Sequence, residues 1–242
     1  MTRTLKALSA LLSYPSQALK EAAPEIARVL VAEGVVSAAA VAGIEPLLDA
    51  LWTRDLYELE EEYVFLFDRS RSLSLNLFEH VHGESRDRGQ AMVDLLETYR
   101  AGGFDLDAAE LPDHLPVLLE FLATRPLGEA RETLADAAHI LAALAHRLRG
   151  RDSAYGAVFD ALVEIAAEQP DAAALDLLKA EPFDDPADLA ALDAVWEETA
   201  VTFGPDPNAG CPATRDLLAR MDAPQRAAGA LPERRAVAAP AR

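Results

Sequence analysis

Apolar residues recur at every third or fourth position along almost the whole chain, a spacing that places them on one face of an α-helix. The clearest stripe comprises Leu134, Ala137, Ala138, Leu141, Leu144, Ala145 and Leu148. Runs of alternating β-branched residues, typical of strands, are lacking, and alanine and leucine, which favour helix, are abundant. The sequence therefore predicts an all-α protein.

Glycine and proline residues predict where these helices begin and end. Gly102 closes a helix that begins near Ser85, and Gly150 closes the long helix of the clearest stripe. Gly43 and Pro46 are expected to interrupt the region that follows the first predicted helices.

We expect the helices to pack as one domain, because each has a single apolar stripe to bury. The expectation is a single-domain helical bundle of about eight to ten helices over residues 1–221, with a weak division near residues 125–130. Residues 68–77 are polar and serine-rich, and we expect them to be irregular. Residues 222–242, rich in alanine, proline and arginine, are predicted to form a disordered tail.

The charge balance excludes several classes of ligand. With 41 acidic and 22 basic residues, the net charge is −19, which repels phosphate backbones and anionic lipid headgroups. The longest charge-free apolar run, residues 34–44, has 11 residues, far short of the ~20 that span a bilayer. One cysteine, Cys211, excludes an internal disulfide framework and fits a reducing compartment. We expect a cytoplasmic protein that binds no nucleic acid and does not insert into membranes.

Residues 78–89 (FEHVHGESRDRG) form the most unusual stretch. His80 and His82, with Glu84 beside them and His114 elsewhere, are residue types that bind zinc or iron. The His-x-His spacing places both rings on one face only in an extended segment, and this one lies between predicted helices. We therefore expect no metal ligand, and a metal-dependent enzyme that uses His80 and His82 is the alternative hypothesis.

The same stretch opens a helix. Ser85 is suited to cap it, but Arg86 and Arg88 in its first turn oppose the positive end of the helix dipole. Such arginines need fixed partners. Internal carboxylates are the favoured partners, and a bound ligand is the alternative.

Residues 110–122 predict a further helix. Asp113 is a natural N-cap, Pro116 is tolerated in the first turn, and leucines form a stripe to be buried. His114 is expected near the surface. Two interpretations stay open: a capped helix with a solvated histidine, or a groove whose lip carries Asp113 and His114 as polar contacts.

An acidic cluster precedes an aromatic run. Four glutamates lie within residues 58–62, and residues 63–67 contain Tyr63 and Phe67. The cluster is either a solvated helix face above a buried face, or a binding surface for a basic, amphipathic segment. Phosphate-binding loops, dinucleotide fingerprints, zinc-protease motifs and nucleophile elbows are absent from the sequence, which favours a binding protein over an enzyme.

Several of these motifs together resemble the respiratory nitrate reductase assembly chaperones, the NarJ family (the delta chain). The similar segments are EYVFLFD (62–68), SLNLFEHVHGESRDRGQAM (74–92), ELPDHLP (110–116), LEFL (119–122) and LDAVWEE (192–198). The Pro-Asp-His element also resembles the wider TorD-like group of redox-enzyme maturation chaperones. The resemblance implies an all-α, TorD-like fold without enzymatic activity.

The resemblance also implies a function and a partner. Family members bind the apo catalytic molybdenum subunit of nitrate reductase, including its N-terminal segment. They keep it competent for insertion of bis-molybdopterin guanine dinucleotide, delay its membrane attachment and are absent from the final enzyme. No cofactor is expected to stay bound, and molybdenum cofactor biosynthesis proteins are expected as further partners. A chaperone of a related molybdoenzyme is the alternative.

In the wider group the Pro-Asp-His element contributes to peptide binding, which here maps to Pro112, Asp113 and His114. The sequence predicts neither a catalytic residue nor a metal ligand. The predicted partner-binding residues are Glu62, Tyr63, Phe67, His80, His82, Glu84, Arg86, Arg88, Pro112, Asp113, His114, Pro116 and Glu120.

Overall fold

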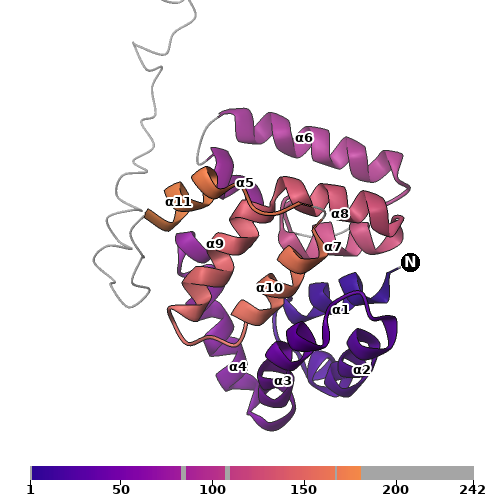
Figure 1. The fold of residues 1–242 in the computed structure, drawn as a ribbon, viewed down its shortest axis with the longest axis vertical. Coiled ribbons are helices and arrows are strands. Elements are labelled where there is room, and N and C mark those ends of the chain that lie inside the picture. Colours follow the sequence, from indigo (N-terminus) through magenta and orange to yellow (C-terminus); the bar gives the residue numbers. More distant parts are fainter. Residues whose placement is uncertain (1, 83–85, 107–109, 167, 181–242) are drawn as a thin grey trace, which may run out of the picture. The chain divides into compact units, whose positions relative to one another are not determined.

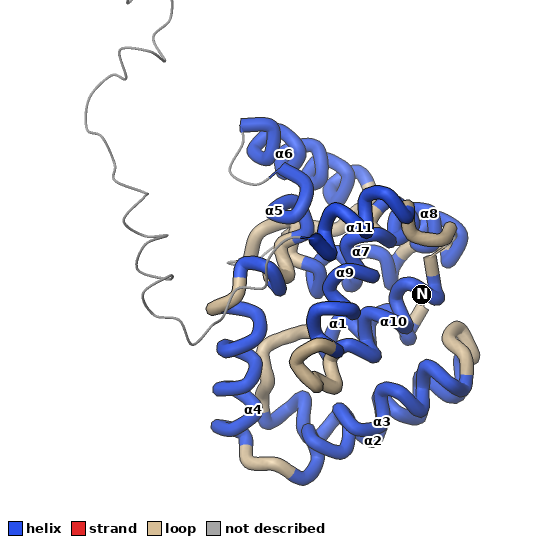
Figure 2. Tube along the Cα trace, turned by 60° about the vertical axis from the view of Figure 1, so that its left-hand side comes forward, coloured by secondary structure: helices blue, strands red, loops and turns tan. Residues whose placement is uncertain are grey.

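The protein is built from packed α-helices, as the periodicity predicts. The computed structural model describes residues 2–82, 86–106, 110–166 and 168–180, and these contain eleven α-helices and no strand (Figures 1 and 2). The α-helices are α1 (Arg3–Leu11), α2 (Gln17–Glu33), α3 (Ala38–Thr53), α4 (Leu56–Tyr63), α5 (Leu77–His82), α6 (Arg86–Ala101), α7 (Leu115–Thr124), α8 (Leu127–Asp136), α9 (Ala138–Arg149), α10 (Gly156–Ile165) and α11 (Ala172–Ala180). The all-α class is thereby confirmed. The predicted tail, Cys211 and the LDAVWEE segment lie outside the described residues.

The first helix packs against α7, although more than 100 residues separate them in the chain. Leu5, Leu8 and Leu11 of α1 are fully buried, and each such side chain contributes roughly 1.5–3 kcal/mol to stability. Ser9 of α1 donates a hydrogen bond from Oγ to the Pro116 carbonyl oxygen at 2.7 Å. This pairing fixes the end of α1 beside the start of α7, where the candidate site lies.

Two expected interruptions are absent from α3. The helix runs through Gly43 and Pro46, so the predicted break there is wrong. Both residues are exposed, whereas Ile44, Leu47 and Leu48 are buried. Burial of this apolar face outweighs the missing backbone hydrogen bond of a proline on the solvent side.

One predicted helix proves to be two. The stripe over residues 134–148 is divided between α8 and α9 at Ala137, whose φ of −99° and ψ of 1° are not helical. Leu134 and Leu141, on either side of the turn, are both fully buried, so the apolar pattern continues across it. The predicted end of α9 at Gly150 is confirmed.

The predicted end of α6 at Gly102 is also confirmed. A Cβ atom at Gly102 would lie 2.6 Å from Cε2 of Phe121, so only glycine fits this approach of α6 to α7. Gly103 follows with φ +74°, a left-handed conformation that commonly ends helices.

The serine-rich segment is irregular, as expected, but it is buried. A π-helical turn, η1 (Val64–Asp68), leads into a short 3-10 helix, η2 (Arg71–Leu73). Ser72 and Leu73 are both buried, and the Ser72 carbonyl oxygen accepts a hydrogen bond from Nη1 of Arg147 at 2.7 Å. Arg147, itself 2% exposed, also donates from Nη2 to the Leu178 carbonyl oxygen. One arginine of α9 therefore joins η2 to α11.

Candidate functional site

A pocket of about 390 Å³ opens between the end of α1, η1 and the first turns of α7. Four of the predicted partner-binding residues line it: Tyr63, His114, Pro116 and Glu120. The other lining residues are Ser9, Ser13, Tyr14, Asp68, Glu110 and Val117. We call this space the acidic pocket, because three carboxylates, those of Asp68, Glu110 and Glu120, face it.

The wall of the acidic pocket is aromatic. Tyr63 is 4% exposed, and its hydroxyl donates to the Leu12 carbonyl oxygen at 2.9 Å, which leaves the ring as its contribution to the pocket. The Tyr14 ring lies edge-on to the Tyr63 ring, with centroids 5.5 Å apart. Phe67, predicted to bind the partner, is buried beneath Tyr63 at a centroid distance of 4.9 Å and does not line the pocket.

His114 presents an imidazole to the acidic pocket. It occupies the N-cap position of α7, so the prediction of Asp113 as that cap is wrong by one residue. Burial lowers the pKa of His114, although the carboxylates of Glu110, Asp113 and Asp68 act in the opposite direction. Its Nδ1 is buried and has no hydrogen-bond partner among the described residues. The imidazole is therefore neutral at neutral pH.

Asp113 caps a different helix. It is 1% exposed, and its Oδ2 accepts a hydrogen bond from the backbone N–H of Phe78 in α5 at 3.1 Å. The two helix starts lie side by side because the Leu115 N–H donates to the Leu75 carbonyl oxygen at 2.8 Å. Burial raises the pKa of Asp113, whereas the Phe78 N–H and Arg88 lower it. Asp113 thus joins the start of α7 to α5 and does not itself line the acidic pocket.

Arg88 has the internal partners that its unfavourable position in the first turn predicts. Its Nη2 lies 2.9 Å from Oε1 of Glu79 and 3.9 Å from Oδ2 of Asp113. These contacts join α6 to α5 and to the start of α7, and the interpretation of Arg88 as internally paired fits them. The side chains of His82 and Arg86, together with residues 83–85 and thus Glu84 and the expected Ser85 cap, lie outside what the structure describes.

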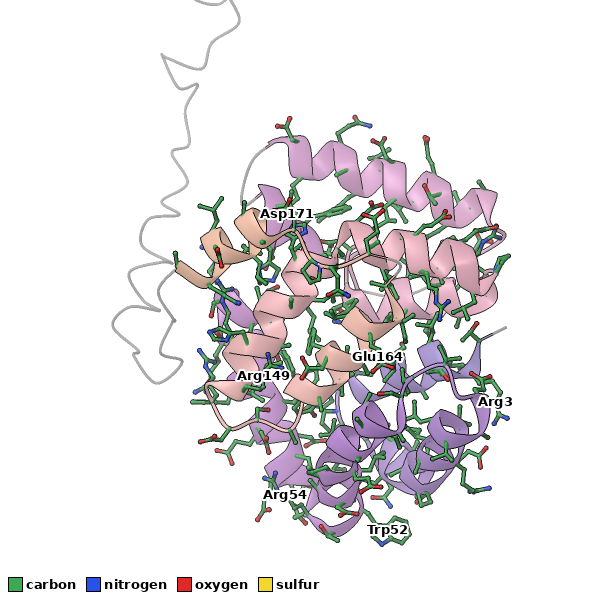
Figure 3. The ribbon with its side chains drawn as sticks, viewed as in Figure 1. Arg3, Trp52, Arg54, Arg149, Glu164 and Asp171 are labelled. Atoms are coloured by element: carbon green, nitrogen blue, oxygen red, sulfur yellow. The ribbon has the colours of Figure 1, made fainter. Side chains whose placement is uncertain are left out.

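The remaining predicted residues lie away from the acidic pocket. The Pro112 carbonyl oxygen accepts a hydrogen bond from the Tyr99 hydroxyl at 2.7 Å, and Nε2 of His80 lies 2.8 Å from the Ser74 carbonyl oxygen. Glu62 forms an ion pair with Arg54, which follows α3 directly (Figure 3). In the described part of the chain, no group of three or more His, Cys, Asp or Glu residues could hold a metal ion.

A second pocket, of about 300 Å³, adjoins the first and shares Tyr14 with it. We call it the aromatic pocket. Its lining consists of Tyr14, Tyr57, Glu60, Glu61, Val64, Phe65 and Arg69. Tyr57 is 80% exposed and Phe65 39% exposed, so two aromatic side chains face solvent beside the acidic cluster.

Sequence reasoning missed Tyr14, Tyr57 and Asp68 as lining residues. The acidic cluster was the available signal, because it marked α4 as a binding surface for a basic segment. Tyr14 gave no signal, since it precedes a proline near the first predicted helix and only the packing of α1 on α7 brings it here.

Comparison with known families identifies a match over more than half of the chain. The family model described as nitrate reductase delta subunit matches residues 15–161, which include every lining residue of the two pockets except Ser9, Ser13 and Tyr14. The chain belongs to the nitrate reductase delta subunit family. The resemblance drawn from the sequence motifs is confirmed.

Relatives are named as assembly chaperones. The chain is 45% identical over 204 residues to the nitrate reductase molybdenum cofactor assembly chaperone NarJ of Escherichia coli K12, covering 84% of this chain and 86% of that protein. It is 39% identical over 208 residues to the probable assembly chaperone NarW of the same strain, covering 86% of each chain. For the probable NarJ of Bacillus subtilis 168 the identity is 32% over 163 residues, covering 66% of this chain and 86% of that protein. None of the helices in the described ranges is long and apolar enough to cross a membrane.

Proposed function

We propose that this family member is a chaperone, not an enzyme, and that it assists molybdenum cofactor insertion during assembly of a respiratory nitrate reductase. The observation that carries the proposal is the pair of adjoining pockets, one acidic and one aromatic, that share Tyr14. An acidic rim around apolar walls suits a basic, amphipathic peptide. The names of the relatives support the reductase as the client.

The partner is the apo catalytic subunit, recognised through its N-terminal segment. Glu60 and Glu61 at the aromatic pocket, and Asp68, Glu110 and Glu120 at the acidic pocket, form no ion pair with any described residue. Five such carboxylates attract a cationic segment and speed its encounter with the surface.

The cofactor itself binds to the partner and not to the chaperone. Bis-molybdopterin guanine dinucleotide carries phosphates, and the three carboxylates of the acidic pocket repel them. The chaperone therefore acts on the protein partner, and keeps it competent for cofactor insertion before membrane attachment. It leaves the mature enzyme because it prefers the apo subunit, whose N-terminal segment is free before maturation and packed afterwards.

The test is isothermal titration calorimetry of the full chain with a peptide from the N-terminus of the cognate catalytic subunit. We expect binding, and we expect His114→Ala to weaken it while far-UV circular dichroism stays unchanged. His146→Ala is the matched control, because His146 is exposed on α9 and lines neither pocket. Absence of binding, together with normal nitrate reductase activity in a deletion strain, would refute the proposal.

A further inference from the structure

The two pockets share a single wall. Tyr14, 50% exposed, lines both, and its ring is held edge-on against Tyr63. A ligand that fills both pockets therefore crosses one aromatic ring. The two groups that it inserts therefore enter neighbouring pockets.

The acidic pocket has the chemistry of a cation site with defined walls. Asp68, Glu110 and Glu120 line it, and neither lysine nor arginine does. Partial burial raises the pKa of Asp68 and the nearby charge of Glu110 raises it further, against the smaller opposing effect of His114. His114 adds a polar ring to the lining. The rings of Tyr14 and Tyr63 add faces suited to cation–π contact.

The aromatic pocket has a different character. Tyr57, Val64 and Phe65 give it apolar walls, and the charged side chains of Glu60, Glu61 and Arg69 lie beside them. An apolar side chain that enters this pocket removes the exposed surfaces of Tyr57 and Phe65 from water.

We propose that the acidic pocket binds one arginine or lysine side chain of the partner segment, and that the aromatic pocket binds an apolar side chain three or four residues away. This inference rests on the proposed function and adds the chemistry and spacing of what is recognised. In a helix, residues three or four apart lie on one face with Cβ atoms about 5–6 Å from each other, so two such side chains can enter two pockets that adjoin at Tyr14. Charge-assisted hydrogen bonds to the carboxylates hold the cation.

Other ligands fit the acidic pocket less well. A phosphate or carboxylate would meet three carboxylates. A metal ion lacks a suitable donor set, since no group of three or more candidate ligands comes together in the described residues. A cationic side chain needs only the charge and the aromatic walls that are present.

The test is a set of double-mutant cycles measured by calorimetry with the full chain and peptides from the N-terminus of the cognate catalytic subunit. In the peptide, each lysine or arginine is replaced in turn by glutamine and each apolar residue by alanine. In the chaperone, Glu110→Gln with Glu120→Gln alters the acidic pocket, and Tyr57→Ala alters the aromatic one. The control is Glu97→Gln with Glu132→Gln, which makes the same change in net charge at exposed sites outside both pockets.

We expect the acidic-pocket variant to bind the wild-type peptide at least about tenfold more weakly than the control variant does. One cationic peptide position should couple to Glu110 and Glu120, and one apolar position, three or four residues away, should couple to Tyr57. Additive cycles at every position, or coupled positions at another spacing, would overturn the inference and leave the proposed function standing. If the wild-type peptide does not bind the wild-type chain, the proposed function fails, and the inference fails with it.

Discussion

Asp113 and His114, neighbours in the Pro-Asp-His element, have different roles. Asp113 is directed inward, where it caps α5 and lies near Arg88, and His114 is directed toward the acidic pocket. A buried carboxylate that accepts a backbone N–H and lies near a guanidinium can hold a loop in one conformation. Asp113 is therefore a positioning residue for His114.

Replacement of Asp113 should cost stability. Asp113→Ala removes the acceptor of the Phe78 N–H and one of the two carboxylates near Arg88, so we expect a loss of roughly 1–3 kcal/mol in the free energy of unfolding. Asp113→Asn keeps an oxygen acceptor and should lose less. Urea unfolding measures both, with exposed Glu132→Ala as a control expected to change by less than about 0.5 kcal/mol. Equal losses for alanine and asparagine would contradict the capping role.

His114 should make stability depend on pH. The pKa of His114 is lower in the folded protein than its ordinary value of 6.5. The contribution of the neutral imidazole to the free energy of unfolding is therefore complete above pH 6.5, and it is lost as the pH falls through the folded pKa. His114→Gln removes this titration. Between about pH 7.5 and about pH 5, the free energy of unfolding of the wild type should therefore fall relative to that of the variant. Asp68 and Asp113 titrate in both proteins and largely cancel in the difference, and parallel pH profiles would rule out the role of His114.

At the scale of elements, α6 is anchored near both ends, and between them Leu95 packs half-buried against the core. Arg88 holds the first turn, and near the last turn Tyr99 is fully buried, with its ring 4.8 Å from that of Phe121. Between them Val93 is 48% exposed, and Figure 1 shows α6 along the margin of the helical assembly. Apart from Tyr99, none of the described α6 side chains is fully buried, so α6 has lower local stability than the core helices α9 and α10.

The Tyr99 anchor can be removed in two steps. Tyr99→Phe loses only the hydrogen bond to the Pro112 carbonyl oxygen, at a cost of roughly 0.5–1.5 kcal/mol. Tyr99→Ala also loses the ring contacts, at roughly 3–5 kcal/mol. Hydrogen exchange should accelerate over residues 86–101 in both variants, and more in the second, while α9 and α10 change least. Uniform acceleration across the described helices would show that α6 does not open separately.

At the scale of the whole molecule, the net charge governs how fast the protein associates with a charged partner. The net charge of −19 surrounds pockets that carry their own carboxylates, so the global and the local potentials have the same sign. Long-range attraction raises the association rate with a cationic partner more than it raises affinity.

The association rate should therefore depend on salt. Between about 50 and about 500 mM NaCl, stopped-flow fluorescence should show the rate constant for the cationic peptide falling by roughly tenfold, with a smaller change in the dissociation rate. A rate constant that stays flat across this range would exclude electrostatic steering.

Local signals in the sequence predicted some features, and long-range packing determined others. The end of α6 at Gly102 was predictable because paired glycines commonly end a helix, and Gly103 adopts the left-handed conformation there. The continuity of α3 through Pro46 was not, because it depends on burial of the opposite face. The place of Tyr14 in the pocket lining could not be predicted either, since nothing near it in the sequence shows that α1 packs on α7.

Arg147 has a consequence for the order of synthesis. Its two carbonyl partners stand 75 residues before it and 31 residues after it, at Ser72 and Leu178. A nascent chain that has not yet released residue 178 from the ribosome must either expose this guanidinium or bury it with one bond missing. The hydrogen bonds of Arg147 to Ser72 and Leu178 are therefore completed only once residue 178 has emerged, after α1 to α10 have been made.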